Sequence, residues 1–341
     1  MERLDELFNT KELLNYYRVK NPVPMLGDTL FPARKIQDIK LDMITGANGL
    51  PVSASINAFD TETQLASKET LQKGAADLSL VKRKIAIGEK DIIAINNHRM
   101  DSEQKELVME LFKYGDKMVS AVQTRIEAMR MELLSSGKIA INENGVAITL
   151  DYSVPKSNIK NFNWSDPATA KPLEDIRVLA DAVEETSGTK PTRILTSTKV
   201  LNKILMCESV RKAIFGVSFD RMATRNDLNT LLDGMELPQI AVYNAKYKVQ
   251  VKGGKYTTKR YFPENALSVF AENQLGESIY GLTAEEIELI GAKNMEEAKM
   301  VGNIFVGVEK QGDPVKRFTK ASTTCLPTLE NGLELGIATI S

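Results

Sequence analysis

The sequence predicts an α+β fold organised around one long helix, and three observations support this prediction. The longest helical pattern runs without proline from Ser102 to Ser136. A polar two-stranded excursion precedes it between Pro51 and Glu89, and helices alternate with strands after Pro172. With 341 residues the chain is long for a single compact core, so we expect two or more linked lobes.

Apolar residues recur at spacings of three and four within 102–136, which places them on one face of a helix. They are Leu107, Leu111, Tyr114, Met118, Val122, Ile126, Met129 and Leu133. Most charged residues, including Lys105, Glu110, Lys113, Asp116 and Lys117, lie off this stripe, so we expect a mostly solvated opposite face. Asp101 with Gln104 predicts the start of the helix, and Gly137 predicts its end. At 1.5 Å per residue the rod is roughly 52 Å long, and we interpret it as a structural spine.

The charge balance and the cysteines argue against several classes of protein. Lysine and arginine number 44 against 45 acidic residues, so no overall positive charge favours nucleic acid or an anionic membrane. The two cysteines, Cys207 and Cys325, form neither a disulfide framework nor a zinc pattern, and we expect both to be buried. No signal-peptide pattern and no run of about 18 apolar residues occurs, so we expect no membrane role.

The N-terminal part predicts an arm followed by a ribbon. Residues 4–19 have helical spacing and precede Pro22 and Pro24, so this helix packs either on its own domain or on a neighbouring subunit. A strand is expected at Arg34–Met43, before a glycine-rich turn. The polar ribbon at 51–89 would bury little apolar surface, so it should pack on its own subunit, fold on a partner or be mobile.

Lys82, Arg83 and Lys84 form a small basic cluster on the returning strand of this ribbon. One interpretation is a solvated strand edge, and the other is a charge contact between subunits. Both remain open from the sequence.

The second half of the chain predicts an α/β lobe and several terminal strands. Asn144-Gly145 predicts a hairpin within 139–152, and Trp164 is expected to anchor a loop by packing. The elements expected after it are a helix at 173–186, a strand at 192–196, helices at 199–215 and 225–232, a strand at 239–243, a hairpin at 247–262 and a strand at 266–271. Residues 272–300 are acidic with a helical start at Thr283, and strands are expected at 304–309, 315–324 and 333–340.

The sequence offers little catalytic chemistry. His98 is the only histidine, so one chain supplies no two-histidine metal site, and we interpret His98 as a structural residue. Gly302 and Gly307 have the spacing of a phosphate-binding loop, but Val308 stands where its lysine would be required. We therefore predict no catalytic residue, no metal and no cofactor.

Several short motifs resemble those of the lambda-type major capsid protein E family of tailed bacteriophages. They are Gly27-Asp28-Thr29-Leu30-Phe31-Pro32, Leu50-Pro51-Val52, Phe262-Pro263-Glu264-Asn265, Tyr280-Gly281 and the stretch from Ala321-Ser322 to Leu326-Pro327. Each motif is short, but their order and spacing extend over residues 27–341. The resemblance implies the Hong Kong 97-like capsid fold.

That fold has an arm, an extended loop, a peripheral domain with a spine helix, and an axial domain. The corresponding segments here would be 1–45 for the arm and first strand, 46–95 for the extended loop, 96–165 with 272–314 for the peripheral domain, 166–271 for the axial domain, and 315–341 for its C-terminal strands. Lys82, Arg83 and Lys84 would then be candidates for an inter-subunit contact. No long N-terminal scaffolding segment is present, which suggests a separate scaffolding protein.

The resemblance implies a structural protein that self-assembles into pentamers and hexamers of an icosahedral head shell, in the virion of a tailed phage or in a prophage. Its implied partners are other copies of the chain, a scaffolding protein, a portal, a decoration protein and packaged double-stranded DNA contacted without sequence specificity. Assembly would take place in the host cytoplasm. The alternatives are an encapsulin-like nanocompartment shell and, from a different class, a soluble α/β enzyme, which the single histidine disfavours.

Overall fold

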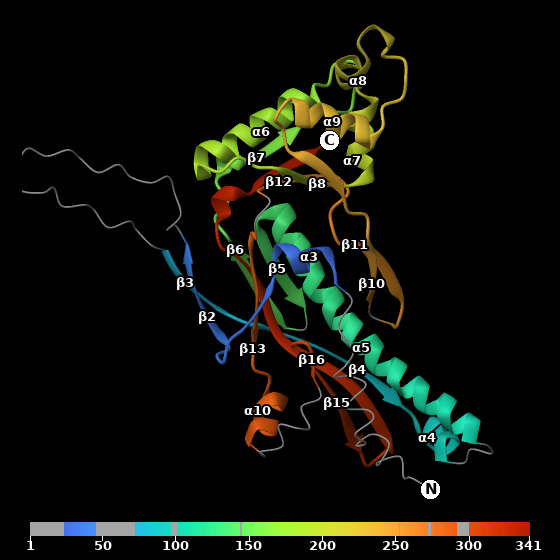
Figure 1. Cartoon of the computed structure of the whole chain (residues 1–341). Helices are drawn as coiled ribbons and strands as arrows, with labels where there is room; N and C mark the ends of the chain where they lie inside the picture. Colours follow the sequence, from blue (N-terminus) through green and yellow to red (C-terminus); the bar gives the residue numbers. More distant parts are fainter. Residues whose placement is uncertain are drawn as a thin grey trace, which may run out of the picture. The chain divides into compact units, whose positions relative to one another are not determined.

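The computed structural model describes residues 24–45, 72–96, 101–143, 145–251, 253–271, 274–291 and 300–341 (Figure 1). The expected N-terminal helix at 4–19, the ribbon residues 51–71 and His98 lie outside these ranges. Among the described helices, none combines the length and apolar character needed to cross a membrane.

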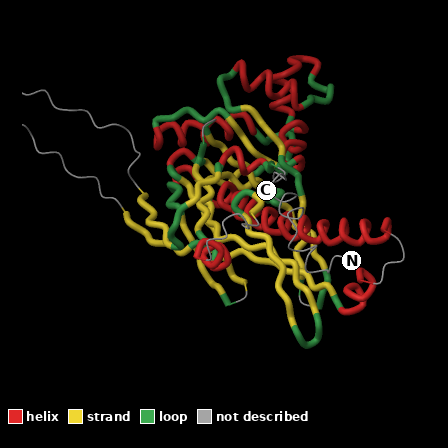
Figure 2. Tube along the Cα trace, turned by 60° about the horizontal axis from the view of Figure 1, so that its bottom comes forward, coloured by secondary structure: helices red, strands yellow, loops and turns green. Residues whose placement is uncertain are grey.

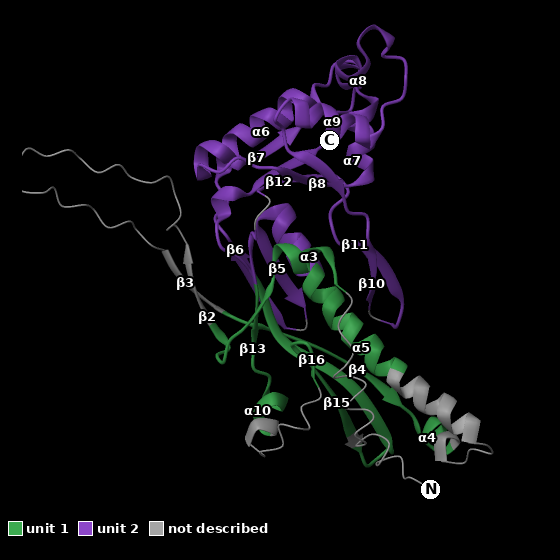
Figure 3. Cartoon of the chain, in the orientation of Figure 1, with its two compact units in different colours: residues 1–41, 77–127, 278–327 green, residues 42–76, 128–277, 328–341 purple. Residues whose placement is uncertain are grey.

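The chain divides into two compact units, each assembled from separate stretches of sequence (Figure 3). The first unit comprises residues 1–41, 77–127 and 278–327, and the second comprises 42–76, 128–277 and 328–341. The boundary falls inside the long helix α5 (Asp101–Ser136), after Glu127.

The first unit is built around a six-stranded sheet. Its elements are α3 (Leu26–Leu30), β1 (Ala33–Lys35), β4 (Ser79–Ile87), α4 (Glu89–Asn96), the first part of α5, β13 (Gly276–Gly281), α10 (Ala284–Gly291), β14 (Met300–Val301), β15 (Ile304–Gln311) and β16 (Lys316–Leu329). The strand order is β1-β13-β16-β15-β14, and β4 also pairs with β16. A separate two-stranded sheet joins β2 (Lys40–Thr45) and β3 (Gln72–Asp77), most of whose residues belong to the second unit.

Strand β16 organises this sheet because it pairs with three other strands. Its residues from Lys316 to Ser322 pair antiparallel with β15, and those from Arg317 to Cys325 pair antiparallel with β4. The returning strand of the expected ribbon is therefore part of a sheet within its own chain.

The second unit holds a five-stranded sheet of order β7-β17-β12-β8-β9. Its elements are the last part of α5, β5 (Lys138–Glu143), β6 (Val146–Asp151), η1 (Lys156–Asn158), β7 (Ile159–Phe162), α6 (Pro172–Ser187), β8 (Arg193–Thr196), α7 (Thr198–Met206), α8 (Glu208–Phe215), η2 (Gly216–Ser218), α9 (Arg225–Gly234), β9 (Gln239–Val242), β10 (Lys246–Gln250), β11 (Tyr256–Arg260), β12 (Ala266–Phe270), η4 (Gly332–Glu334) and β17 (Gly336–Ile340). The pairs β5-β6 and β10-β11 form two-stranded sheets.

One apolar core joins helices α6–α9 to the five-stranded sheet. Leu179 of α6, Ile204 of α7 and Leu228 of α9 are fully buried in it together with Val269 of β12. The cluster also includes Trp164, whose indole N–H donates to Asp175 Oδ2 at 2.7 Å. Trp164 is thus a packing anchor, as expected.

The sequence predicted most of these elements, but one helix is broken. The expected helix at 199–215 is divided into α7 and α8 at Cys207, whose backbone is extended (φ −64°, ψ 130°). Glu208 N–H donates to Pro167 O at 2.9 Å, and Ser209 Oγ donates to Ala170 O at 2.8 Å. The first contact replaces a helical hydrogen bond of the backbone, and the second holds the start of α8 to the same distant loop. Local periodicity indicates neither contact.

The expected capsid segments with boundaries at 165, 271 and 314 stay a prediction, and the two compact units divide the chain at other positions. Residues 315–341 were expected together, but the units separate 327 from 328. The physical reason is strand pairing, because β16 continues across the sheet of the first unit while β17 belongs to the five-stranded sheet.

Helix α5 is one continuous helix of 36 residues (Figure 2). It ends at Gly137, where φ is +69° and the N–H donates to Leu133 O at 2.8 Å. A Cβ atom on residue 137 would come within 2.7 Å of Val154 Cγ2, so both the backbone conformation and the close approach require glycine.

The buried surface of α5 contains the expected stripe and, near its end, more. Met118, Val122, Ile126, Met129 and Leu133 are each 5% exposed or less. The side chains of Leu107 and Leu111 lie outside those that the structure describes.

The expectation of a mostly solvated opposite face is wrong for the last turns of α5. Glu127 and Arg130, which lie off the stripe, are 0% and 2% exposed. Within the first unit, Glu127 Oε1 accepts a hydrogen bond of 3.0 Å from Gly27 N–H, in the first turn of α3. Burial of this carboxylate is tolerated because it is hydrogen-bonded at a helix N-terminus.

We predict that Met118→Asp prevents folding and assembly, whereas Lys117→Asp is tolerated. Removing a buried methionine side chain already costs about 2–5 kcal/mol, and an unpaired carboxylate adds a desolvation cost. Lys117 is exposed, and its Nζ lies 5.3 Å from the centroid of the Tyr114 ring, a contact that contributes about 0.5–1 kcal/mol at such a site. Soluble yield, circular dichroism and electron microscopy of particles measure the difference. Assembled shells of the Met118→Asp variant would show that this face of α5 is not buried.

Candidate assembly surface

The predicted basic cluster does not form one patch. It lies in β4, where exposed and half-buried residues alternate, so Lys82 and Lys84 project from one face and Arg83 from the other. Lys82 and Lys84 are exposed, whereas Arg83 is half-buried. The side-chain alternation of a strand therefore separates three cations that are adjacent in sequence.

Lys84 lies over neighbouring strands of its own sheet. Its Nζ is 3.7 Å from Glu309 Oε2 on β15 and 4.5 Å from the centroid of the Phe318 ring on β16. The register pairs Lys84 with Lys320 and Lys82 with Ser322. The cluster thus continues onto β16 through Lys320.

Lys320 is the centre of a charge network that the sequence analysis missed. Its Nζ donates to Glu309 Oε1 on β15 and lies 3.0 Å from Glu285 Oε1 on α10, and the Lys320 side chain is only 19% exposed. The three residues come from separate segments, so spacing along the chain does not reveal them. The available signal is one lysine within the otherwise uncharged stretch Phe318–Leu329.

Two lysines hold the acidic first turn of α10. Lys320 contacts Glu285, and Lys35 on β1 donates to Glu286 Oε1 at 2.9 Å. Glu286 also accepts from Thr283 N–H at 3.1 Å, while Thr283 Oγ1 accepts from Glu286 N–H at 3.3 Å. This reciprocal cap begins the helix where the sequence predicted it.

The charges of this network shift its pKa values. The hydrogen bond from Lys320 is the main cause that lowers the pKa of Glu309. Burial acts to raise the pKa of Glu285, but hydrogen bonds from its own backbone N–H and from Lys320 outweigh it and leave the pKa lowered. Burial likewise opposes the charged form of Lys320, yet the two carboxylates raise its pKa overall.

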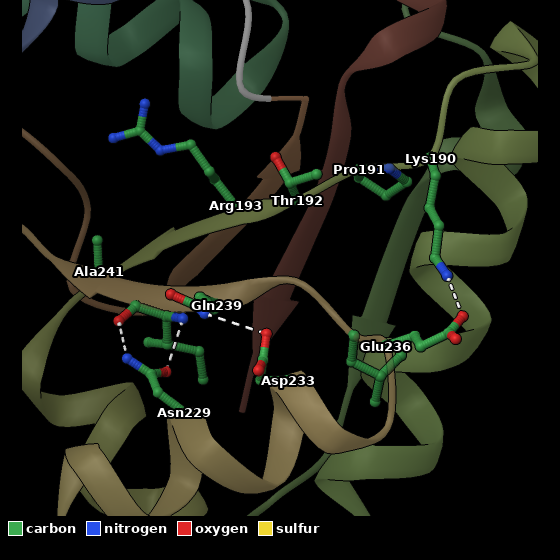
Figure 4. Close-up of a pocket in the computed structure, with 11 residues that line it drawn as sticks. Lys190, Pro191, Thr192, Arg193, Asn229, Asp233, Glu236, Gln239 and Ala241 are labelled. Carbon is green, nitrogen blue, oxygen red and sulfur yellow. Dashed lines mark hydrogen bonds and ion pairs between the residues drawn. The ribbon is translucent and has the colours of Figure 1, made fainter.

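A polar cavity of about 540 Å³ lies at the β9 edge of the five-stranded sheet (Figure 4). The Asn229 amide on α9 donates to Ile240 O at 3.2 Å and accepts from Ile240 N–H at 2.9 Å. Lys190 pairs with Glu236 at 2.8 Å, and Gln239 Nε2 lies 3.5 Å from Asp233 Oδ1. The cavity walls are therefore held by internal pairs, and Asn229 occupies the free backbone groups of an edge strand.

The described residues contain no group of three or more His, Cys, Asp or Glu side chains arranged to hold a metal ion. Cys207 and Cys325 are both buried, as expected, and burial raises the pKa of the Cys207 thiol. The charge network around Lys320 is suited to holding strands and a helix together.

We predict that this network stabilises the protein fully between pH 4.5 and pH 10.5 and progressively less outside this range. Glu285 and Glu309 have lowered pKa values in the folded state, so their contribution is full above the ordinary value of 4.5 and is lost as the pH falls through the folded values. Lys320 has a raised pKa, so its contribution is full below 10.5 and is lost as the pH rises through the folded value.

The Tm difference between wild type and Lys320→Met should therefore be largest near neutral pH and shrink below pH 4.5. Lys316→Met, at the half-exposed start of β16, is the matched control and should show a small, flat difference. Parallel profiles for the two variants would refute a role for the network.

Comparisons with known proteins place the fold. A family model described as phage major capsid protein E matches residues 9–332. The crystal structure of a protein described as a capsid protein of a prophage, from Escherichia coli CFT073, is similar with a TM-score of 0.61 at 16% identity, covering 100% of this chain and 99% of that one. A phage-related protein from Bordetella bronchiseptica RB50 gives 0.54 at 12% identity, with 96% of each chain covered. No curated protein sequence matches.

These findings confirm the expected fold and family. The structure has the Hong Kong 97-like capsid fold, an α+β fold in which helices and strands are mixed. Because the family model extends over nearly the whole chain, the protein belongs to the phage major capsid protein E family, the shell-forming capsid proteins of tailed phages and prophages.

Proposed function

We propose that this chain forms pentamers and hexamers that build the icosahedral head shell of a tailed double-stranded DNA phage or prophage. The observation that carries the proposal is the match of the capsid family model to residues 9–332. The protein acts through the geometry of its contacts with other copies and not through catalysis.

The two units suggest how one chain suits several positions in a shell. Copies in pentamers and hexamers have slightly different surroundings, so each subunit needs rigid parts and adjustable ones. The apolar core around Leu179 and the sheet around β16 supply rigid parts. We assign adjustment to the arm at 1–45 and to the tip of the extended loop within 46–95, whose returning strand β4 is held in its own sheet.

The proposed partners follow from this role. Other copies of the chain are the main partners, and a separate scaffolding protein guides their assembly in the host cytoplasm before the virion is complete. A portal and a decoration protein complete the shell. The packaged DNA meets the inner surface without sequence specificity, which fits a chain with 44 basic and 45 acidic residues.

Expression of the full chain, alone and together with the genes beside it, tests the proposal by electron microscopy. The expected result is closed shells of uniform size that enclose double-stranded DNA when the complete gene set is present. Shells that enclose an enzyme would support the encapsulin-like alternative, and a chain that stays monomeric in every combination would refute a shell-forming role.

We further predict that replacing Lys82, Arg83 and Lys84 by alanine impairs shell assembly more than folding. Lys84 forms a solvent-exposed pair with Glu309, and such pairs contribute about 0–1 kcal/mol to stability, so the Tm should change little. Replacing Lys156, Lys160 and Arg225 by alanine is the charge-matched control. The particle yield of each variant is compared with its Tm. If the variant at Lys82, Arg83 and Lys84 loses folded monomer and particles equally, the three residues have a purely intramolecular role.

A further inference from the structure

The hairpin formed by β10 and β11 is the most basic part of the described chain, and the function proposed above does not explain it. Residues 246–260 contain five lysines, one arginine and no acidic residue. The rest of the chain therefore carries 38 basic and 45 acidic residues. A local cation excess on a chain that is otherwise acidic indicates a surface that meets an anionic partner.

The hairpin presents its charges on an exposed ribbon. The two strands form a two-stranded sheet of their own, in which Lys246 pairs with Arg260, Lys248 with Thr258 and Gln250 with Tyr256. Directly opposed residues share a face, so Lys246, Lys248 and Tyr256 lie on the same side. Arg260 is paired with Glu264 at 2.9 Å, but Lys246 and Lys248 are exposed and have no ion pair among the described residues.

The opposite face of the hairpin carries different residues and makes a packing contact. Tyr247 packs against the Tyr261 ring, with centroids 4.7 Å apart, and Lys255 and Lys259 lie on this side. Tyr256 on the first face is 58% exposed. The face with Lys246, Lys248 and Tyr256 thus combines two cations that have no ion pair among the described residues with a largely exposed aromatic ring.

Helix α6 presents the complementary surface. Its inner side buries Ile176, Leu179 and Val183 in the core. Its outer side carries Glu174, Val178, Asp181 and Glu185, which are spaced by four, three and four residues and so share one face. Val178 is 51% exposed in the middle of this acidic stripe.

Within this stripe, the carboxylates of Asp181 and Glu185 are available for ion pairs with a partner. Glu174 pairs with Lys171 at 2.9 Å, whereas Asp181 and Glu185 have no ion pair in the part of the chain that the structure describes. Lys190 acts on Asp181 only at longer range, because its Nζ pairs with Glu236. Helix α6 and the hairpin belong to the same unit and lie apart in Figure 1, so one copy does not bring these two surfaces together.

We propose that the β10-β11 hairpin of one copy docks on the outer face of α6 of a second copy. This inference rests on the proposed self-assembly and names a contact within it. Lys246 and Lys248, two residues apart on a strand, are separated by roughly 6.7 Å, and Asp181 and Glu185, four apart on a helix, by roughly 6 Å. The two cations therefore match the two carboxylates, and Tyr256 covers Val178.

The contact uses different surfaces on the two copies, so it is heterologous. A heterologous contact repeated around an axis closes a ring, as pentamers and hexamers require. Duplex DNA could also attract the lysines, but phosphate contacts would not require that they lie on one face with Tyr256, and they would not cover Val178. A second copy accounts for both surfaces.

A charge-swap experiment on the full chain tests the proposal. The four variants are Lys246→Glu with Lys248→Glu, Asp181→Lys with Glu185→Lys, the combination of all four, and the control Lys255→Glu with Lys259→Glu. The control makes the same charge change on the other face of the hairpin. Particle formation is measured by sedimentation and electron microscopy, and folding by circular dichroism and Tm.

We expect both double variants of the contact to fold but lose particles, the combination to regain them, and the control to assemble like wild type. Assembly of the Lys246→Glu, Lys248→Glu variant at the wild-type level would overturn the contact while leaving the shell function intact. Equal loss of particles in the control variant would also overturn the contact. Shells of normal form that contain less DNA would overturn it too, because the hairpin would then be a DNA contact. A wild-type chain that forms no oligomer would instead refute the proposed function and, with it, this contact.

Discussion

Both units of the protein are built against the buried surface of α5. An isolated helix of this amphipathic composition gains little stability in water, so its apolar stripe needs partners along its length. Its later turns are buried nearly all round, with Glu127 bonded to α3 in the first unit and Leu134 O accepting from Ser268 of β12 in the second. Each unit thus holds its own part of one continuous helix.

Strand β16 has a similar role within the first unit. Because it pairs with β4, β15 and β13, segments that are distant in sequence share one sheet. The charges around Lys320 then join β15, β16 and the start of α10. A lysine that is largely buried between two carboxylates is tolerated only because its hydrogen bonds offset the loss of hydration.

The total charge of the chain is nearly neutral, but its basic and acidic residues are concentrated in different segments. The β10-β11 hairpin carries only cations, while the exposed face of α6 carries mainly carboxylates. Neither surface is needed for the apolar core around Leu179 and Val269, which is closed without them. Folding and association can therefore rest on different residues, with buried apolar groups for the first and exposed charges for the second.

The sequence alone determined what depends on local periodicity and backbone conformation. The apolar spacing of α5, the glycine at 137, the hairpin within 139–152 and the helix start at Thr283 were all predicted, because each involves residues close together in the chain. Short motifs in a fixed order also indicated the capsid family.

Other features depend on contacts between residues that are distant in sequence, so only the tertiary structure reveals them. The break at Cys207 depends on hydrogen bonds to a loop about forty residues away, and the Lys320 network depends on the register of separate strands. Lys82, Arg83 and Lys84 are adjacent in sequence but point to opposite faces of β4, since side chains alternate along a strand and only pairing with β16 shows what each face meets.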